Sequence, residues 1–310
     1  MERGFMDTRK ELQGHLLAFM TIFIWGTTFI STKLLLESIT PVEILFLRFA
    51  IGFLILLLAY PHRLRIRERK QDLYFAAAGL CGVTLYFLLE NIALTYTFAS
   101  NVGVIVAISP FFTALFAHLF LDTEKLRVRF FIGFSVAVVG IILISFNGSN
   151  NLQLNPLGDI LAVLAAVVWA AYSVLTKKIS GFHYNTIQAT RRIFFYGLVF
   201  MIPALCILGF NPDITELTRP NNLFNILFLG LGASALCFVT WNSAVKLLGA
   251  VKTSVYIYLV PVITVITAVI VLREEITGVS VLGIVLTLTG LLISERKGRH
   301  IPQQTEASKA

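Results

Sequence analysis

The sequence predicts an all-α integral membrane protein of ten transmembrane helices, built from two inverted five-helix repeats. The first observation is composition: the 310 residues are 57% hydrophobic and 14% charged, with a mean hydropathy of +0.82. Soluble domains normally contain about 25% charged residues. The second observation is an internal repeat with a constant offset of 151 (242 − 91, 261 − 110, 275 − 124), which pairs Asn91 with Asn242, Pro110 with Pro261, and Glu124 with Glu275.

Ten mostly apolar stretches of about 20 residues are each long enough to cross a hydrocarbon core about 30 Å thick. In the first half we expect helices at residues 14–36, 42–60, 73–95, 100–121 and 129–146. In the second half we expect them at residues 158–177, 186–208, 223–247, 253–272 and 278–294. The segments between them are polar, basic or rich in proline and asparagine, as turns and loops are, and they include residues 38–41, 62–70, 147–156 and 209–222.

The distribution of lysine and arginine predicts the orientation, because cytoplasmic loops collect these residues. With the N-terminus inside, the outer loops contain only Arg219 and Arg273. We therefore expect residues 1–13 and 296–310 to be cytoplasmic, and residues 147–157 to form an extracytoplasmic linker. The net charge of +8 is scattered over short inner segments, which argues against a nucleic-acid partner and suits lipid headgroups.

The repeat also predicts how the two halves are related. Its offset is 144 nearer the start of each half, where Trp25 pairs with Trp169 and Arg48 with Arg192. Small shifts at loops and none inside helices indicate a true duplication, with repeats at residues 14–146 and 158–295. Each half has five spans, an odd number, so the second copy must insert upside down relative to the first.

Several motifs follow one another in order and are echoed in the second half: Trp25-Gly26-Thr27-Thr28-Phe29 with Lys33, Asn91-x-Ala93-Leu94-x-Tyr96, Pro110 followed by Glu124, and the pair Gly133 and Gly140. Over residues 14–295 this ordered set resembles the EamA family of the drug/metabolite transporter superfamily. The resemblance implies a ten-helix carrier with a central cavity, usually exporting amino acids or related small metabolites across a bacterial inner membrane. Two departures are Ala170, where the first half has Gly26, and Glu274 beside Glu275.

Aromatic and polar residues in the spans are candidates to line a solute cavity. Trp25 and Trp169 lie near the middle of their spans, whereas tryptophans of an interfacial belt lie at the ends. The candidates are Trp25, Thr28, Tyr86, Glu90, Asn91, Ser109, Trp169, Tyr172, Trp241, Asn242 and Tyr256. Such a lining suits a neutral or zwitterionic, partly apolar solute. For each tryptophan, helix packing with the indole N–H bonded to a neighbouring backbone remains open.

Charged side chains inside a membrane usually face a cavity or a partner. Glu90 is a candidate for proton coupling or for binding a solute amine, and the alternative is a carboxylate that reaches the outer surface. Arg48 and Arg192 are candidates for binding a solute carboxylate or for ion pairs at a gate. The alternative for both arginines is capping of helix ends or contact with lipid headgroups.

Prolines and glycines predict how the helices bend and pack. Pro110 and Pro261 lie inside predicted spans and are expected to act as symmetry-related hinges. The pairs Gly133 and Gly140, and Gly283 and Gly290, are each spaced to share one helical face, so we expect close helix contacts there. These contacts fall within one protomer or between two, which leaves a homodimer open.

The sequence offers little support for other classes of protein. It contains no HExxH, Walker lysine loop or GxSxG motif, so we expect no enzyme, and no metal or cofactor. Cys81, Cys206 and Cys237 lie in predicted helices and are odd in number, so they indicate no disulfide framework. The alternatives that remain are a multidrug or toxic-compound efflux carrier, a channel, and a receptor or scaffold.

Overall fold

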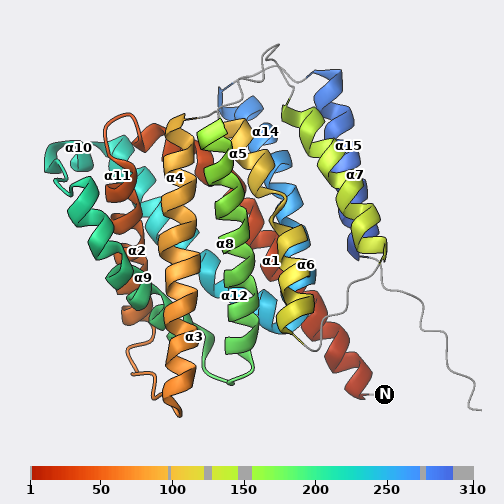
Figure 1. Ribbon diagram of the computed structural model, residues 1–310, viewed down its shortest axis with the longest axis horizontal. Helices are drawn as coiled ribbons and strands as arrows, with labels where there is room; N and C mark the ends of the chain where they lie inside the picture. The colour runs from red at the N-terminus through yellow and green to blue at the C-terminus, as the bar shows by residue number, and fades with distance from the viewer. Residues whose placement is uncertain (1, 97–98, 122–127, 146–155, 273–276, 296–310) are drawn as a thin grey trace, which may run out of the picture.

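The computed structural model describes residues 2–96, 99–121, 128–145, 156–272 and 277–295. Within these ranges the chain forms helices joined by turns and short loops, and it contains no strand. The predicted tail, most of the predicted linker, and Glu124 and Glu275 of the repeat lie outside the described residues. The helices form an upright bundle, with α7 and α15 paired along one side (Figure 1).

Six helical stretches of the described chain are long and apolar enough to cross a membrane: Arg9–Leu35, Pro41–Ala59, Arg69–Tyr96, Pro156–Ser180, Thr186–Leu208 and Pro220–Leu248. Shorter apolar helices lie at Ser109–Phe120, Val128–Leu143, Ala250–Thr264 and Val281–Ser294. The protein is therefore a multi-pass membrane protein. The count of ten spans stays a prediction, since the second group falls short of the length of a full crossing.

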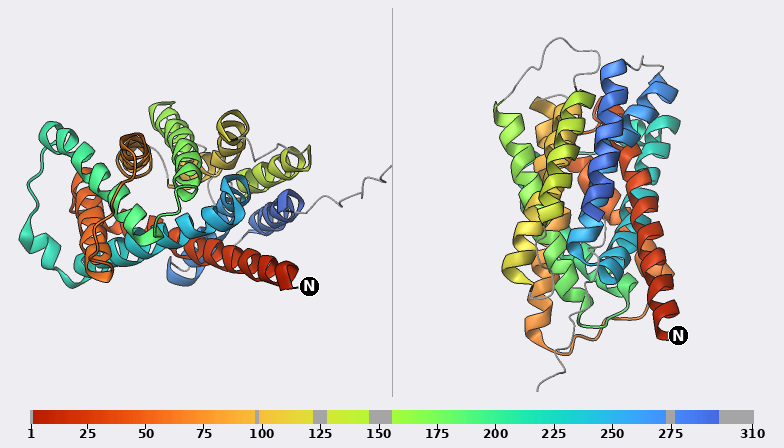
Figure 2. Two further views of the ribbon diagram at one scale, coloured as in Figure 1. Left: turned by 90° about the horizontal axis from the view of Figure 1, so that it is seen from below. Right: turned by 90° about the vertical axis from the view of Figure 1, so that its right-hand side faces the viewer.

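The first half contains α1 (Glu2–Leu35), α2 (Pro41–Ala59), α3 (Arg69–Gly79), α4 (Tyr86–Tyr96), α5 (Ala99–Val106), α6 (Ser109–Phe120) and α7 (Val128–Ser145). The second half contains α8 (Pro156–Ser180), α9 (Thr186–Leu208), α10 (Ile214–Thr218), α11 (Pro220–Leu227), α12 (Cys237–Leu248), α13 (Ala250–Val255), α14 (Leu259–Leu272) and α15 (Gly278–Glu295). Helix α1 rises from the end of the bundle that carries the N-terminus, and α8, its counterpart in the repeat, runs the opposite way (Figures 1 and 2). We call the N-terminal end the inner end and the opposite one the outer end, following the predicted orientation.

Helices of one half pack mainly against helices of the other. Helix α1 lies along α12 and α14, and α8 correspondingly lies along α4 and α6. Helix α7 lies along α15. The contacts that α1 of the first half makes with the second half are thus repeated by α8 of the second half with the first half. The main hydrophobic core accordingly draws on both halves, with Phe49 and Phe75 from the first and Phe194 and Phe238 from the second.

A π-helical stretch interrupts one long helix in each half. It is η1 (Leu80–Leu85) between α3 and α4, and η2 (Phe228–Leu236) between α11 and α12. Glycines at corresponding positions allow the neighbouring helix to approach closely. A Cβ on Gly79 would lie 2.6 Å from the carbonyl oxygen of Ile193, and one on Gly230 would lie 2.6 Å from Cγ2 of Ile51.

The two candidate hinge prolines follow breaks between helices, so the prediction that each lies in the middle of a bent helix was wrong. Pro110 occupies the first turn of α6, after a turn at residues 107–108. Pro261 lies near the start of α14, after the 3₁₀ turn η3 (Tyr256–Tyr258). Proline has no N–H and clashes with the preceding turn, so it is tolerated at a helix start better than in the interior.

The prediction of a loop at residues 209–222 was also wrong in part. Asp213 caps α10, with its Oδ1 accepting a hydrogen bond from the backbone N–H of Thr215 at 2.8 Å. Pro220 then begins α11. Polar residues that suit a loop also suit helix caps, and composition alone does not separate the two.

Candidate substrate cavity

A narrow cavity opens between the two halves toward the outer end of the bundle. Its volume is about 60 Å³, enough for only a few waters, since one water needs roughly 10–15 Å³. Its walls come from α1, α2, α4, α5, α8 and the region around η3. Seven of the predicted site residues line it: Trp25, Thr28, Arg48, Tyr86, Glu90, Asn91 and Trp169.

Helix periodicity explains how α1 and α4 each present one face to the cavity. Side chains spaced three, four or seven residues apart share a face of a helix. On α4 this face carries Tyr86, Glu90 and Asn91. On α1 it carries Trp25 and Thr28. The same spacing adds five lining residues on these two helices that the sequence analysis missed: Ile22, Phe29, Thr32, Phe87 and Leu94.

The cavity wall contains two buried groups of opposite charge. Arg48 is 3% exposed and Glu90 7% exposed. The Nε of Arg48 donates to Oγ of Ser234 at 3.0 Å, and its guanidinium carbon lies 4.5 Å from the ring centre of Phe87. The Oη of Tyr86 donates to Oε1 of Glu90 at 2.9 Å. Among the ion pairs of the described residues, none joins Arg48 directly to Glu90, although the two opposite charges attract each other across the cavity wall.

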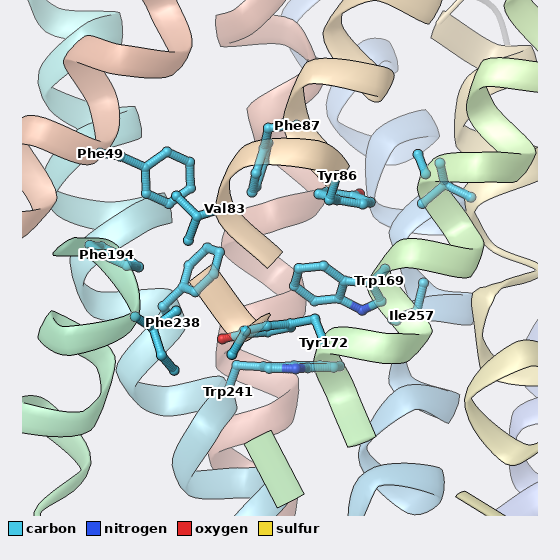
Figure 3. Close-up of a cluster of buried hydrophobic side chains, with 14 of the residues drawn as sticks. Phe49, Val83, Tyr86, Phe87, Trp169, Tyr172, Phe194, Phe238, Trp241 and Ile257 are labelled. Atoms are coloured by element: carbon cyan, nitrogen blue, oxygen red, sulfur yellow. The ribbon is translucent and has the colours of Figure 1, made fainter. Parts of the chain in front are cut away.

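A cluster of large aromatic rings closes the cavity toward the inner end, and we call Trp25, Trp169, Tyr172 and Trp241 the aromatic barrier. Figure 3 shows Trp169, Tyr172 and Trp241 close together. The ring centres of Trp25 and Trp169 lie 5.2 Å apart, and those of Trp169 and Tyr172 lie 5.0 Å apart. Trp25 and Trp241 are likewise separated by 5.2 Å. Contacts at this spacing leave no room for a solute between these rings.

The indole N–H groups of the barrier differ in their partners. Nε1 of Trp25 donates to the carbonyl oxygen of Ala233 at 2.9 Å. Nε1 of Trp169 and Nε1 of Trp241 are buried and have no partner within the part of the chain that the structure describes. Trp169 lines the cavity, but its Nε1 atom is itself buried.

Asn91 and Asn242 occupy corresponding positions in the repeat, but their surroundings differ. Nδ2 of Asn91 donates to the carbonyl oxygen of Pro41 at 3.3 Å, at the edge of the cavity. Asn242 lies below the barrier, where its Oδ1 accepts from Oη of Tyr172 at 2.8 Å and its Nδ2 donates to Oγ1 of Thr190 at 3.0 Å. Asn242 therefore holds a barrier residue in place.

The remaining predicted site residues lie away from the cavity. Ser109 is fully buried at the start of α6, and its hydroxyl has no partner among the described residues. The hydroxyl of Tyr256 lies 2.7 Å from Nδ1 of His15. Arg192 forms a two-pronged ion pair with Asp72 at 3.1 and 2.8 Å. No group of three or more His, Cys, Asp or Glu within the described ranges is placed to hold a metal ion.

The glycine pairs lie at the interface of α7 and α15, within one protomer. A Cβ on Gly140 would lie 2.5 Å from the carbonyl oxygen of Gly283, and one on Gly290 would lie 2.5 Å from that of Gly133. Only glycine permits this separation between two antiparallel helix backbones.

Comparisons with known proteins place these features in a family. The sequence profile described as the EamA-like transporter family matches residues 12–146 and 156–295. An uncharacterized transporter of Archaeoglobus fulgidus is 28% identical, over 91% of this chain and 97% of the relative. A probable terminal-alkyne amino-acid exporter of Streptantibioticus cattleyicolor is 27% identical, over 93% and 95%. A probable amino-acid metabolite efflux pump of Escherichia coli is 23% identical, over 90% and 93%.

A solved crystal structure has the same fold, with a TM-score of 0.73 and 21% sequence identity, covering 91% of this chain and 96% of the other. At that identity the likeness concerns the fold alone. The family match, by contrast, covers most of the sequence in two successive copies. The chain therefore belongs to the EamA-like transporter family.

Proposed function

We propose that the protein is a secondary transporter that exports amino acids or related small metabolites by alternating access across the plasma membrane. The observation that carries this proposal is the cavity in which Arg48 and Glu90 present opposite buried charges beside aromatic walls. Burying a charge costs free energy unless a partner compensates it. A zwitterion supplies both partners, its carboxylate for Arg48 and its ammonium group for Glu90.

The aromatic walls define the rest of the solute. The ring of Trp169 contacts the rings of Trp25 and Tyr86 around the inner end of the cavity. Such surfaces bind apolar side chains. The solute is therefore a small amphipathic zwitterion. The names of two relatives, an amino-acid exporter and an amino-acid metabolite efflux pump, agree with this class.

The membrane arrangement belongs to the same proposal. Ten spans, with repeats at residues 14–146 and 158–295, place both termini in the cytoplasm and residues 147–157 outside. The two halves would then expose the cavity alternately to either side of the membrane. Proton coupling through Glu90 is the proposed energy source.

A second candidate is an efflux carrier for cationic drugs. Glu90 and the aromatic walls favour it, since aromatic faces attract cations. The buried Arg48 opposes it, because a cationic solute leaves that charge without a partner.

A binding screen followed by a transport assay tests both candidates. Purified protein is screened by thermal shift against amino acids, their amides and cationic drugs, and positive compounds are assayed by counterflow in proteoliposomes. The proposal expects stabilisation by amino acids but not by their amides, and saturable counterflow. Stabilisation by cationic drugs alone would favour the second candidate. An ohmic current would show a channel. The absence of both binding and flux would contradict a transport function.

A further inference from the structure

A second, smaller pocket lies on the inner side of the aromatic barrier. Its volume is about 20 Å³, and it is formed between α8, α9 and α12. Thr176 and Asn242 line it, and these residues correspond in the repeat to Thr32 and Asn91, which line the outer cavity (176 − 32 = 144, 242 − 91 = 151). The inner pocket is therefore the counterpart of the outer cavity in the other half.

The charges of the two pockets differ. Arg48 and Glu90 both line the outer cavity. Among the described residues that line the inner pocket, Lys246 alone is charged. The residues that correspond to Arg48 and Glu90 in the second half do not give the inner pocket the same two charges. Arg192 is paired with Asp72, and the counterpart of Glu90 is Trp241 (241 − 90 = 151).

Lys246 is placed to meet a solute that enters from the inner end. It lies one helical turn after Asn242 on α12, in the last turn of that helix. No hydrogen bond or ion pair joins its ammonium group to another side chain in the described part of the chain. The next lysine along the chain, Lys252, differs, since its Nζ lies 3.1 Å from Oε1 of Glu11.

We propose that the inner pocket is an intake site for the anionic group of the solute, with Lys246 as its cation. This inference rests on the proposed transport function. A carboxylate held by Lys246 lies next to Asn242, whose Oδ1 holds the hydroxyl of Tyr172 in the aromatic barrier. The carboxylate accepts a hydrogen bond from Nδ2 of Asn242 in competition with Oγ1 of Thr190, and reorientation of the amide then withdraws Oδ1 from the hydroxyl of Tyr172. The solute meets Lys246 at the inner pocket and passes its carboxylate to Arg48 in the outer cavity.

Charge-selective thiol labelling tests the site without any transport assay. Ser180 lines the inner pocket and carries the reporter, Ser180→Cys, in a chain whose Cys81, Cys206 and Cys237 are changed to serine. Inside-out vesicles are treated with anionic sulfonatoethyl or cationic trimethylammonioethyl methanethiosulfonate. We expect Lys246→Gln to reduce the ratio of anionic to cationic labelling rates by about fivefold, since one nearby charge favours the anion. The matched control, Lys252→Gln, should leave the ratio unchanged.

Transport measured from each face then tests the role of the site. With phenylalanine as the probe, Lys246→Gln should raise the KM at the cytoplasmic face about tenfold and leave the KM at the outer face unchanged. A labelling ratio insensitive to Lys246→Gln, or no labelling from the cytoplasmic face, overturns the inner site. An equal KM change at both faces overturns its role in intake. Absence of counterflow for every amino acid tested with the unmodified protein contradicts the proposed function instead, while the labelling ratio still decides whether the site exists.

Discussion

Glu90 and Arg48 show how burial by the fold determines which charged residues of a membrane protein face a solute. Both lie on helix faces that form the cavity wall, and neither reaches the surface. Lys33 and Lys177 also lie near the ends of apolar helices, yet neither lines the outer cavity or the inner pocket. Position along the sequence is therefore a weaker guide than the face of the helix.

Replacing Glu90 by glutamine tests proton coupling at the level of one residue. The amide keeps the size of the side chain and can still accept a hydrogen bond from Tyr86, but it cannot release a proton. We expect Glu90→Gln to abolish transport driven by a pH gradient and to spare counterflow, which needs no net proton movement. Uptake into proteoliposomes with and without an imposed gradient measures both. Unchanged dependence on the gradient would rule out Glu90 as the coupling group.

The sequence predicted part of the candidate site. Trp25 and Trp169 were identified because tryptophans near mid-membrane are not explained by an interfacial belt, and both line the cavity. Tyr86, Tyr172 and Trp241 were added as further aromatic side chains in the spans; Tyr86 lines the cavity, but Tyr172 and Trp241 lie behind its wall, in the barrier. The criterion gives the depth of a residue in the membrane but not the direction of its side chain, which depends on packing between the halves.

The repeat also overstated the likeness of Arg48 and Arg192. The two occupy corresponding positions, but Asp72 provides a partner for Arg192, whereas Arg48 has Ser234 and the ring of Phe87. The partners come from other helices, so the alignment of the two copies cannot show which residues face each arginine. Asp72 was not among the predicted site residues.

At the scale of elements, the sequence located most helices but not their interruptions. Apolar length predicts a span, yet the π-helical stretches η1 and η2 leave no mark in hydropathy. The prolines did signal an irregularity, and the structure resolves it as a break before α6 and before the body of α14. If these breaks act as hinges, the short helices α5 and α13 can move relative to α6 and α14, which complete the same predicted spans.

The pair α7 and α15 allows a direct test of close packing. A Cβ on Gly290 would lie 2.5 Å from the carbonyl oxygen of Gly133, so Gly290→Ala must push two backbones apart. We expect a loss of about 1–3 kcal/mol in the free energy of unfolding, as for other overpacked sites. Gly278, on the same helix, has no atom within 4 Å of such a Cβ and provides the control. If Gly290→Ala and Gly278→Ala unfold at the same temperature in detergent, the interface between α7 and α15 accommodates the added methyl group and the prediction is wrong.

At the scale of the whole molecule, the packing of each half against the other limits how the cavity can open. Helix α1 lies along α12 and α14 while α8 lies along α4 and α6, so motion of one half changes both pockets together. The outer cavity is the larger one here and the aromatic barrier closes the inner side. The inverted relation of the halves predicts a second conformation with these roles exchanged.

Paired distance measurements test this alternation most directly. Spin labels at Leu36 and Tyr96 report on the outer end, and labels at the repeat counterparts Ser180 and Leu247 report on the inner end (180 − 36 = 144, 247 − 96 = 151). We expect a transported solute to shift the two distance distributions in opposite directions, so that the outer pair shortens as the inner pair lengthens. Two distances that stay fixed in the presence of that solute, or that change in the same direction, would contradict alternating access by the inverted halves.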